Sequence, residues 1–279
     1  MRYLVVGRGW LGLPAIESLG AVSFPHTDIS TDAPLTAAAE RLRDAIRPDE
    51  STVVVNLCGL RHGTTEELSR SNAHIPSIMA TALAGSGAHL VQVGSAAEYG
   101  IPPHQAQLSE ESICSPASDY GVTKLRGTEA VLEAMPTATV LRPFNVVDAD
   151  LPEGSPMRDI GERISRAIAS GTPVELLAAS TIRDYVSRQF VIDSIVTAVR
   201  VRPAGVFNIC SGVGVGTGAI ARMALEDRQM ANAISSSDDS QSSTIIGDPT
   251  RWRVLTGLAQ VLGCRGIVDA LGWSGPMDM

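Results

Sequence analysis

Residues 3–12 read Tyr-Leu-Val-Val-Gly-Arg-Gly-Trp-Leu-Gly, an apolar run that ends in a Gly-x-Gly-x-x-Gly string. The run predicts a buried strand, and the residues up to about Leu19 continue in a helical pattern. Between a strand and a helix, such a string is typical of a turn that holds a dinucleotide pyrophosphate. Gly7 would permit the tight turn, Gly9 would let the backbone approach the pyrophosphate, and Gly12 would let the helix pack closely on the strand.

The same alternation of short apolar segments and helical segments continues to about residue 150. Strands are expected at 21–24, 52–57, 89–93 and 138–142, and helices at 34–46, 64–84 and 119–134. Short apolar strands that alternate with longer helices are typical of a parallel sheet covered on both faces. The sequence therefore predicts an α/β fold, a Rossmann-type doubly wound parallel sheet.

After about residue 150 the alternation loosens, beginning with a loop rich in Pro, Gly and Ser at 150–156. A helix is expected at 158–170, strands at 174–177 and 181–186, a helix at 189–201 and a strand at 205–209 that returns to the main sheet. The serine-rich segment 235–243 is expected to be a mobile loop. We expect residues 1–150, joined by 187–210, to form the dinucleotide-binding domain, and residues 151–186 and 211–279 to form a smaller C-terminal lobe that binds the substrate.

Composition restricts the classes of partner and site. A net charge of −8 argues against nucleic acid as a partner. The four cysteines lie far apart without paired spacing, so neither a metal site nor a disulfide framework is expected. The N-terminal residues run directly into the first strand, and no apolar run reaches the roughly 18 residues needed to cross a bilayer. We therefore expect a cytoplasmic protein with no signal peptide and no membrane partner.

The end of the second strand bears on the choice of cofactor. NAD-binding folds of this type place an acidic residue there for the ribose hydroxyls, but strand 21–24 is followed by Pro25 and His26. Asp28 follows and is the candidate ribose ligand. Arg8, inside the glycine loop, could approach a 2′-phosphate or could equally be a solvated loop residue. These residues favour NADP as the cofactor and leave NAD open.

Tyr120-Gly-Val-Thr-Lys124 stands at the start of the helix expected at 119–134. A spacing of four places Tyr120 and Lys124 on one helix face. Free tyrosine is a poor acid–base catalyst near neutrality because its pKa lies near 10, and a cation one turn away stabilises the phenolate. The ammonium group can also hold nicotinamide ribose hydroxyls. Lys124 is the only lysine among 22 basic residues, and a GC-rich genome would explain that ratio but not the position.

Val93-Gly-Ser-Ala-Ala-Glu-Tyr-Gly100 leaves the strand expected at 89–93 at its carboxyl end. Ligands of open α/β sheets bind in the crevice outside such ends. Ser95 can therefore donate a hydrogen bond to a substrate oxygen beside Tyr120. Alone it would be an ordinary loop serine, but with Tyr120 and Lys124 it forms a candidate catalytic triad.

These motifs together resemble one known family. They are the glycine loop, Asn56-Leu-Cys-Gly59, Asn72, Gly94–Gly100, Tyr120–Lys124, Leu141-Arg-Pro-Phe-Asn145, Arg183-Asp-Tyr-Val186, Asp193, Gly247-Asp-Pro249 and Leu271-Gly-Trp273. In this combination the chain resembles the extended short-chain dehydrogenase/reductases, the NAD-dependent epimerase/dehydratase family, along nearly its whole length.

The resemblance implies roles for the matching positions only. The expected cofactor contacts are Gly7, Arg8, Gly9, Trp10, Leu11, Gly12, Asp28, Leu57, Cys58, Gly59 and Lys124. The expected substrate contacts are Ser95, Glu98, Asn145 and Arg183, with Arg183 at the diphosphate and Asn145 near the phosphates or the crevice floor. Asn72 would support the site from its helix. A turn-capping asparagine, a surface salt-bridge arginine and a helix-interior asparagine are the simpler explanations of Asn145, Arg183 and Asn72.

The residues after Ser95 bear on the reaction. The family's 4,6-dehydratases have an Asp-Glu pair where this chain has Ala96-Ala97, which disfavours dehydration. The Gly94–Gly100 and Arg142–Asn145 segments resemble those of reductases that act on nucleotide-linked 4-keto-6-deoxyhexoses, and Thr27–Asp32 is similar to the dehydrorhamnose reductases. The resemblance therefore implies that NADPH reduces a ketone on a nucleotide-diphosphate sugar, with Tyr120 as proton donor.

Other functions stay open at this stage. A nucleotide-sugar 4-epimerase would use the same triad with retained NAD, and a nucleotide-sensing regulator would use the fold without catalysis. The short serine-rich region before residue 247 departs from the family pattern and leaves the identity of the sugar open. Helices 64–84 and 119–134 are apolar enough to permit a homodimer of the kind found in this family.

Overall fold

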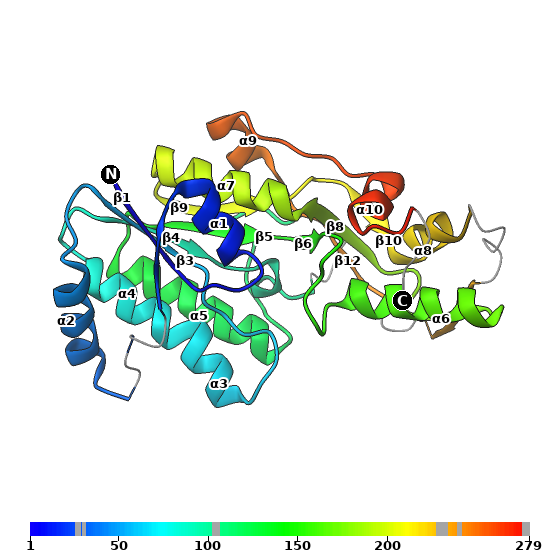
Figure 1. Ribbon diagram of the computed structural model, residues 1–279, viewed down its shortest axis with the longest axis horizontal. Coiled ribbons are helices and arrows are strands. Elements are labelled where there is room, and N and C mark those ends of the chain that lie inside the picture. The colour runs from blue at the N-terminus through cyan, green and yellow to red at the C-terminus, as the bar shows by residue number, and fades with distance from the viewer. Residues whose placement is uncertain (26–28, 30–31, 102–106, 227–233, 239–241, 275–279) are drawn as a thin grey trace.

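The structure is a computed structural model of the 279-residue chain. It describes all residues except 26–28, 30–31, 102–106, 227–233, 239–241 and 275–279 (Figure 1). Asp28, the candidate ribose ligand, lies outside the described residues. No helix in the described part of the chain is long and apolar enough to cross a membrane.

Six strands pair in parallel in the order β2-β1-β3-β4-β5-β9. They are β1 (Arg2–Val6), β2 (Val22–Phe24), β3 (Thr52–Asn56), β4 (His89–Val93), β5 (Thr139–Pro143) and β9 (Gly205–Ile209). The strand order reverses between β1 and β3, and in open α/β sheets ligands bind outside the carboxyl ends at such a point. The predicted doubly wound parallel sheet is confirmed.

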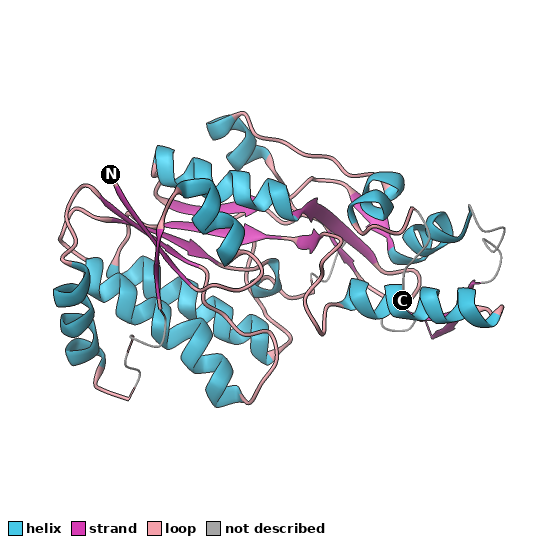
Figure 2. Ribbon diagram, viewed as in Figure 1, coloured by secondary structure: helices cyan, strands magenta, loops and turns pink. Residues whose placement is uncertain are grey.

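Helices cover both faces of this sheet (Figures 1 and 2). One face carries α1 (Gly12–Leu19), α7 (Arg188–Val201) and α9 (Thr250–Thr256), and the other carries α2 (Leu35–Ile46), α4 (Ile75–Leu83) and α5 (Asp119–Ala134). Because side chains alternate along a strand, Val5 packs toward α1 and α7, whereas Leu4 and Val6 pack toward α2 and α4. Both faces are buried, which explains why the strands are continuous apolar runs.

The single helix expected at 64–84 is divided by a π-helical turn. It begins as α3 (Thr65–Ser69), widens at Arg70–His74 and continues as α4. Thr64 and Glu67 form a capping box that fixes its start. The π turn carries Asn72, and such turns are frequent at functional sites.

Beyond β5 the chain builds a second, smaller group of elements. It contains β6 (Asn145–Val147), α6 (Pro156–Ser170), β7 (Val174–Leu177), β8 (Ile182–Ser187), β10 (Gly214–Gly216), α8 (Thr217–Glu226), β11 (Ile234–Asp238), β12 (Thr244–Ile245) and α10 (Cys264–Ala270). β8 pairs with β6, β10 and β12, and a separate apolar cluster fills this part. Figure 1 shows the group beyond the carboxyl end of β5, on the side where a ligand crevice is expected.

The serine-rich segment corrects one expectation. Its first part is not a loop, because β11 pairs in parallel with β7, from Ile234 opposite Val174 onward. Pairing of this kind uses backbone groups, so a strand can form where the sequence shows no apolar alternation. Residues 239–241 of the segment lie outside the described residues.

Candidate active site

The glycine loop between β1 and α1 has three glycines in three different environments. Gly7 has φ +99°, and a Cβ there would lie 2.8 Å from the carbonyl carbon of Leu57. A Cβ on Gly12 would lie 2.1 Å from the backbone oxygen of Gly7, so both positions require glycine for folding. A Cβ on Gly9 would meet nothing within 4 Å. The Cβ position of Gly9 therefore faces open space among the described residues.

At the α1 N-terminus, the backbone N–H groups of Gly12 and Leu13 donate to the Gly9 carbonyl at 2.9 and 3.2 Å. Leu11, the N-cap of α1, makes no side-chain cap hydrogen bond, and Arg8 is exposed. Trp10 reaches the apolar cluster of the second group, and the Arg188 guanidinium lies 5.2 Å from its ring centroid. The glycine loop thus contacts both parts of the molecule.

The loop after β3 lies against the glycine loop. The backbone N–H of Cys58 donates to Asn56 Oδ1 at 3.0 Å, and Asn72 bonds the Leu60 N–H and carbonyl at 2.9 Å each. Burial raises the pKa of the Cys58 thiol to about 12 despite the nearby Lys124, so the thiol is protonated near neutrality. These hydrogen bonds therefore hold the segment from Leu57 to Gly59 in place beside Gly7. The segment carries no charge near neutrality.

Lys124 is buried and points across the end of β4. Its Nζ donates to the Val93 carbonyl at 2.6 Å, and Gln92 Nε2 donates to the same oxygen at 3.1 Å. A Cβ built on Gly59 would lie 3.7 Å from Nζ, so the ammonium group is close to the loop after β3. An ammonium has three donors, and this contact uses one of them.

Tyr120 and Ser95 lie at the same end of β4, on two segments in backbone contact. Ser118 caps α5 by accepting from the Gly121 N–H at 3.1 Å. A Cβ on Gly121 would lie 2.5 Å from the Ala97 carbonyl oxygen, so α5 begins directly against the 3₁₀ turn at Ala96–Glu98. Tyr120 and Ser95 are both half-buried. The structure thus places Ser95, Tyr120 and Lys124 on adjoining segments at the carboxyl end of β4.

Glu98 lies beneath this site and not on its surface. Its carboxylate is fully buried and forms an ion pair with Arg142, with 2.7 Å between Oε2 and Nε. Its Oε1 accepts from the Ser95 N–H at 2.8 Å, and Ser95 Oγ accepts from the Ala97 N–H at 3.2 Å. In this position Glu98 cannot touch a substrate. The Ser-x-x-Glu spacing of a capping box is the sequence signal for this arrangement.

Asn145 and Arg183 lie together in the second group, on neighbouring strands β6 and β8. Asn145 Nδ2 donates to the Asp184 carbonyl at 2.9 Å. The Arg183 guanidinium donates to the Ile182 carbonyl at 2.8 Å and to the Ser243 carbonyl and hydroxyl, the latter at 2.8 Å. Both side chains are half-buried, and Arg183 is already bound to the segment before β12.

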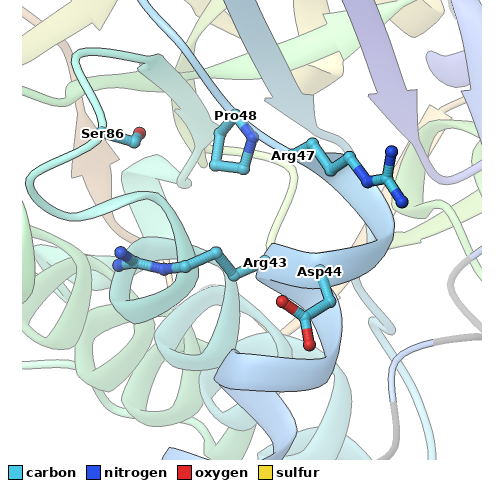
Figure 3. A pocket seen from close by; sticks show the side chains of 5 residues that line it. All are labelled: Arg43, Asp44, Arg47, Pro48 and Ser86. Atoms are coloured by element: carbon cyan, nitrogen blue, oxygen red, sulfur yellow. The ribbon is translucent and has the colours of Figure 1, made fainter.

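A pocket elsewhere in the molecule is not part of this site (Figure 3). It is lined by Arg43, Asp44, Arg47, Pro48 and Ser86. These residues precede β3 and β4 and so lie at the amino-terminal ends of the parallel strands. Ser95 and Lys124 lie at the opposite, carboxyl-terminal ends of the strands.

Comparison with known proteins finds relatives in sequence and in fold. A 4-dehydrogenase of Kitasatospora kifunensis, named dTDP-6-deoxy-L-talose 4-dehydrogenase (NAD(P)(+)), is 28% identical over 261 residues, covering 90% of this chain and 77% of that protein. A Streptomyces antibioticus protein, named probable dTDP-4,6-dihydroxy-2-methyloxan-3-one 4-ketoreductase, is 31% identical over 157 residues, covering 51% of this chain and 50% of that protein. The structure of RMD from Pseudomonas aeruginosa complexed with NADPH superposes with a TM-score of 0.77 at 19% identity, covering 98% of this chain and 99% of that chain.

The family model covers most of the sheet and the segments that carry Ser95, Tyr120 and Lys124, but β1 and the glycine loop precede the matched residues. The model of the NAD dependent epimerase/dehydratase family matches residues 22–210, from β2 through α5 to the strand β9 that completes the sheet. The match covers more than half of the chain and includes Ser95, Tyr120 and Lys124. The resemblance seen in the sequence is confirmed, and the chain belongs to the NAD dependent epimerase/dehydratase family.

Proposed function

We propose that this protein is an NADPH-dependent ketoreductase that acts on a nucleotide-linked 4-keto-6-deoxyhexose. The observation that carries the proposal is that the segments bearing Ser95, Tyr120 and Lys124 adjoin at the carboxyl end of β4, where Lys124 Nζ donates to the Val93 carbonyl. The names of two relatives support the substrate class, since one is a dTDP-sugar 4-dehydrogenase and the other a 4-ketoreductase.

The residues around the glycine loop fit a dinucleotide. Gly9 keeps open space, the α1 N-terminus has no side-chain cap, and Lys124 has two donors beyond the one bound to Val93. We assign the glycine loop to the pyrophosphate, the Leu57–Gly59 segment to the cofactor's nicotinamide half, and Lys124 to its ribose hydroxyls. When bound, NADPH supplies the hydride that reduces the carbonyl carbon.

Two features favour NADP over NAD. Arg8 is exposed in the glycine loop, and β2 ends at Phe24 without an acidic residue at its tip. A 2′-phosphate needs a cation where a ribose hydroxyl would need a carboxylate. The Pseudomonas aeruginosa structure is an NADPH complex, and the name of the Kitasatospora relative includes both cofactors.

The chain's own residues would share the proton chemistry. Ser95 Oγ accepts from the Ala97 N–H, which leaves its proton free to be donated to a carbonyl oxygen. Tyr120 would donate the proton that completes the alcohol. Lys124 would hold the ribose and stabilise the tyrosinate left behind.

The second group of elements is assigned to the nucleotide sugar. Residues 151–186 and 211–279 would form the substrate-binding lobe beside the dinucleotide-binding residues 1–150 and 187–210. Asn145 lies on β6 and Arg183 on β8, the strand with which β6 pairs, and we assign the diphosphate to these two residues. For this role the Arg183 guanidinium has to exchange its bonds with Ser243 for bonds with phosphate oxygens.

Mixing the protein with NADPH and a panel of nucleotide-linked 4-keto-6-deoxyhexoses tests the reaction. We expect loss of NADPH absorbance with one NADPH consumed for each alcohol formed, and no loss with the matching 4-hydroxy sugars. Inversion at C4 of a 4-hydroxy sugar in the presence of NAD, without net change in the cofactor, would instead identify an epimerase, which the same triad can support. If no sugar of the panel gave either NADPH consumption or inversion at C4, the proposal would be overturned.

Gly9→Ala should weaken NADPH binding by about tenfold or more, which corresponds to about 1.4 kcal/mol. A methyl group at this position meets nothing in the protein, so the fold is retained, but it fills the space assigned to the pyrophosphate. Fluorescence titration of NADPH measures the effect. Gly263→Ala, at another open position, is the matched control and should bind NADPH as the parent protein does. Equal affinity of Gly9→Ala and parent would place the pyrophosphate elsewhere.

A further inference from the structure

A buried ion pair lies directly beneath the proposed triad. The side chains of Glu98 and Arg142 are 0% and 5% exposed, and 2.7 Å separates their charged atoms. Removing two charges from water is expensive, and apolar residues of similar volume are often as stabilising as a buried pair. Stability alone is therefore a poor explanation for this pair, and its contacts suggest another.

The Glu98 carboxylate is shared between Arg142 and the backbone of Ser95. Oε2 accepts from Arg142 Nε, while Oε1 accepts from the Ser95 N–H at 2.8 Å. A Cβ on Gly94 would lie 2.5 Å from Oε1, so this approach depends on glycine beside Ser95. The carboxylate thus fixes the backbone at the start of the turn that carries the Ser95 hydroxyl.

Arg142 is held in turn by Tyr99, which is itself bonded to the neighbouring strand β9. Its guanidinium lies 4.7 Å from the Tyr99 ring centroid, and the Tyr99 hydroxyl donates to Asn208 Oδ1 at 2.7 Å. Asn208 is the partner of Arg142 in the β5–β9 register. Although burial disfavours its charge, Glu98 and Tyr99 raise the pKa of Arg142, so the guanidinium stays charged. The sheet itself therefore anchors the cation that holds Glu98.

We propose that the Glu98–Arg142 pair is a positioning device that sets the Ser95 hydroxyl against the substrate oxygen beside Tyr120. The inference rests on the proposed ketone reduction. The turn fixed by Glu98 also presents the Ala97 carbonyl to Gly121 at the start of α5. One carboxylate thereby controls how Ser95 lies relative to the helix that bears Tyr120. Glu98 and Arg142 touch no substrate and act only through Ser95.

Glu98→Gln is the first test, because glutamine keeps an acceptor for the Ser95 N–H but loses the charge that binds Arg142. We expect kcat to fall about tenfold to thirtyfold while KM changes less than about threefold, since small misplacements of a reacting group are costly. A kcat equal to that of the parent protein would overturn the proposal.

Combining this change with Ser95→Ala separates positioning from a general structural role. If Glu98 acts through Ser95, then Ser95→Ala with Glu98→Gln should be no more than about threefold slower than Ser95→Ala alone. Rate losses that multiply would overturn the positioning role. Full turnover by Ser95→Ala alone would instead refute the serine's part in the proposed function, so the two failures are distinguishable.

Arg142→Lys keeps a positive charge but loses the Nε donor and the planar group over Tyr99. It should reproduce the selective loss of kcat and the same lack of additivity with Ser95→Ala. If Glu98→Gln does not fold, Arg142→Lys replaces it as the test variant. A kcat of Arg142→Lys equal to that of the parent protein would then overturn the proposal.

Two control variants test whether loss of a charge, or lower stability, is by itself enough to reduce kcat. Glu162→Gln removes the exposed partner of Arg158 on α6, and kcat should be unchanged. Leu83→Ala removes a buried side chain from α4 and should lower the thermal midpoint while leaving kcat within about twofold at temperatures where the protein is folded.

Discussion

Tyr120→Phe should lower kcat for ketone reduction by about 10³-fold, within the range that removal of a positioned acid produces. The change deletes one hydroxyl from a half-buried ring at the start of α5 and leaves the apolar part of the side chain in place. No other group is assigned to transfer the proton, because Ser95 is assigned a hydrogen bond to the carbonyl oxygen and Lys124 is assigned to the ribose hydroxyls. NADPH binding should therefore persist in this variant while turnover is lost.

Single-turnover mixing of enzyme, NADPH and the ketone identified by the panel measures this loss directly, free of product release. Tyr3→Phe on β1 is the matched control, because it removes a hydroxyl from a partly buried tyrosine on the far side of the sheet from the triad. Its turnover should equal that of the parent protein. Unchanged turnover by Tyr120→Phe would show that the triad assignment is wrong.

Most of the sheet could be predicted because its strands are buried on both faces. β9 occupies Gly205–Ile209, the residues expected, and α5 occupies Asp119–Ala134, also as expected. β11 could not be predicted, since its sequence is serine-rich and strand pairing with β7 is made through backbone groups. The π turn at Arg70–His74 was also missed, because helical periodicity does not record a single widened turn.

The candidate site likewise combines features set by the local sequence, which can be predicted, with contacts between distant segments, which cannot. The spacing from Tyr120 to Lys124 is one helical turn and could be predicted from the sequence. The pairing of Glu98 with Arg142 spans 44 residues and depends on β4 and β5 being neighbours, which no local pattern reveals. Glu98 was therefore expected at the substrate, whereas the structure places it beneath Ser95. The bonds between Arg183 and Ser243 join segments 60 residues apart and were missed for the same reason.

Lys124→Met should weaken NADPH binding about tenfold or more and lower kcat/KM by about 10³-fold, since it removes both the ribose donors and the charge beside Tyr120. Methionine fills similar space without donors, so the fold should be retained. Lys124→Arg should restore little, because its planar fork differs from a compact ammonium and Nζ lies between the Val93 carbonyl and Gly59. Arg126→Met, an exposed cation on the same helix, is the control and should match the parent protein.

The single lysine also allows a test that does not depend on turnover. Protein grown with ¹³C-labelled lysine should give one side-chain Cε resonance in NMR spectra, and Lys124→Met should give none. If the ammonium holds the cofactor, this resonance should shift as NADPH is added and reach saturation with the affinity found by fluorescence. A resonance unmoved by saturating NADPH would remove Lys124 from the cofactor site. Because the chain has no second lysine, no other ammonium side chain could account for a shift that does occur.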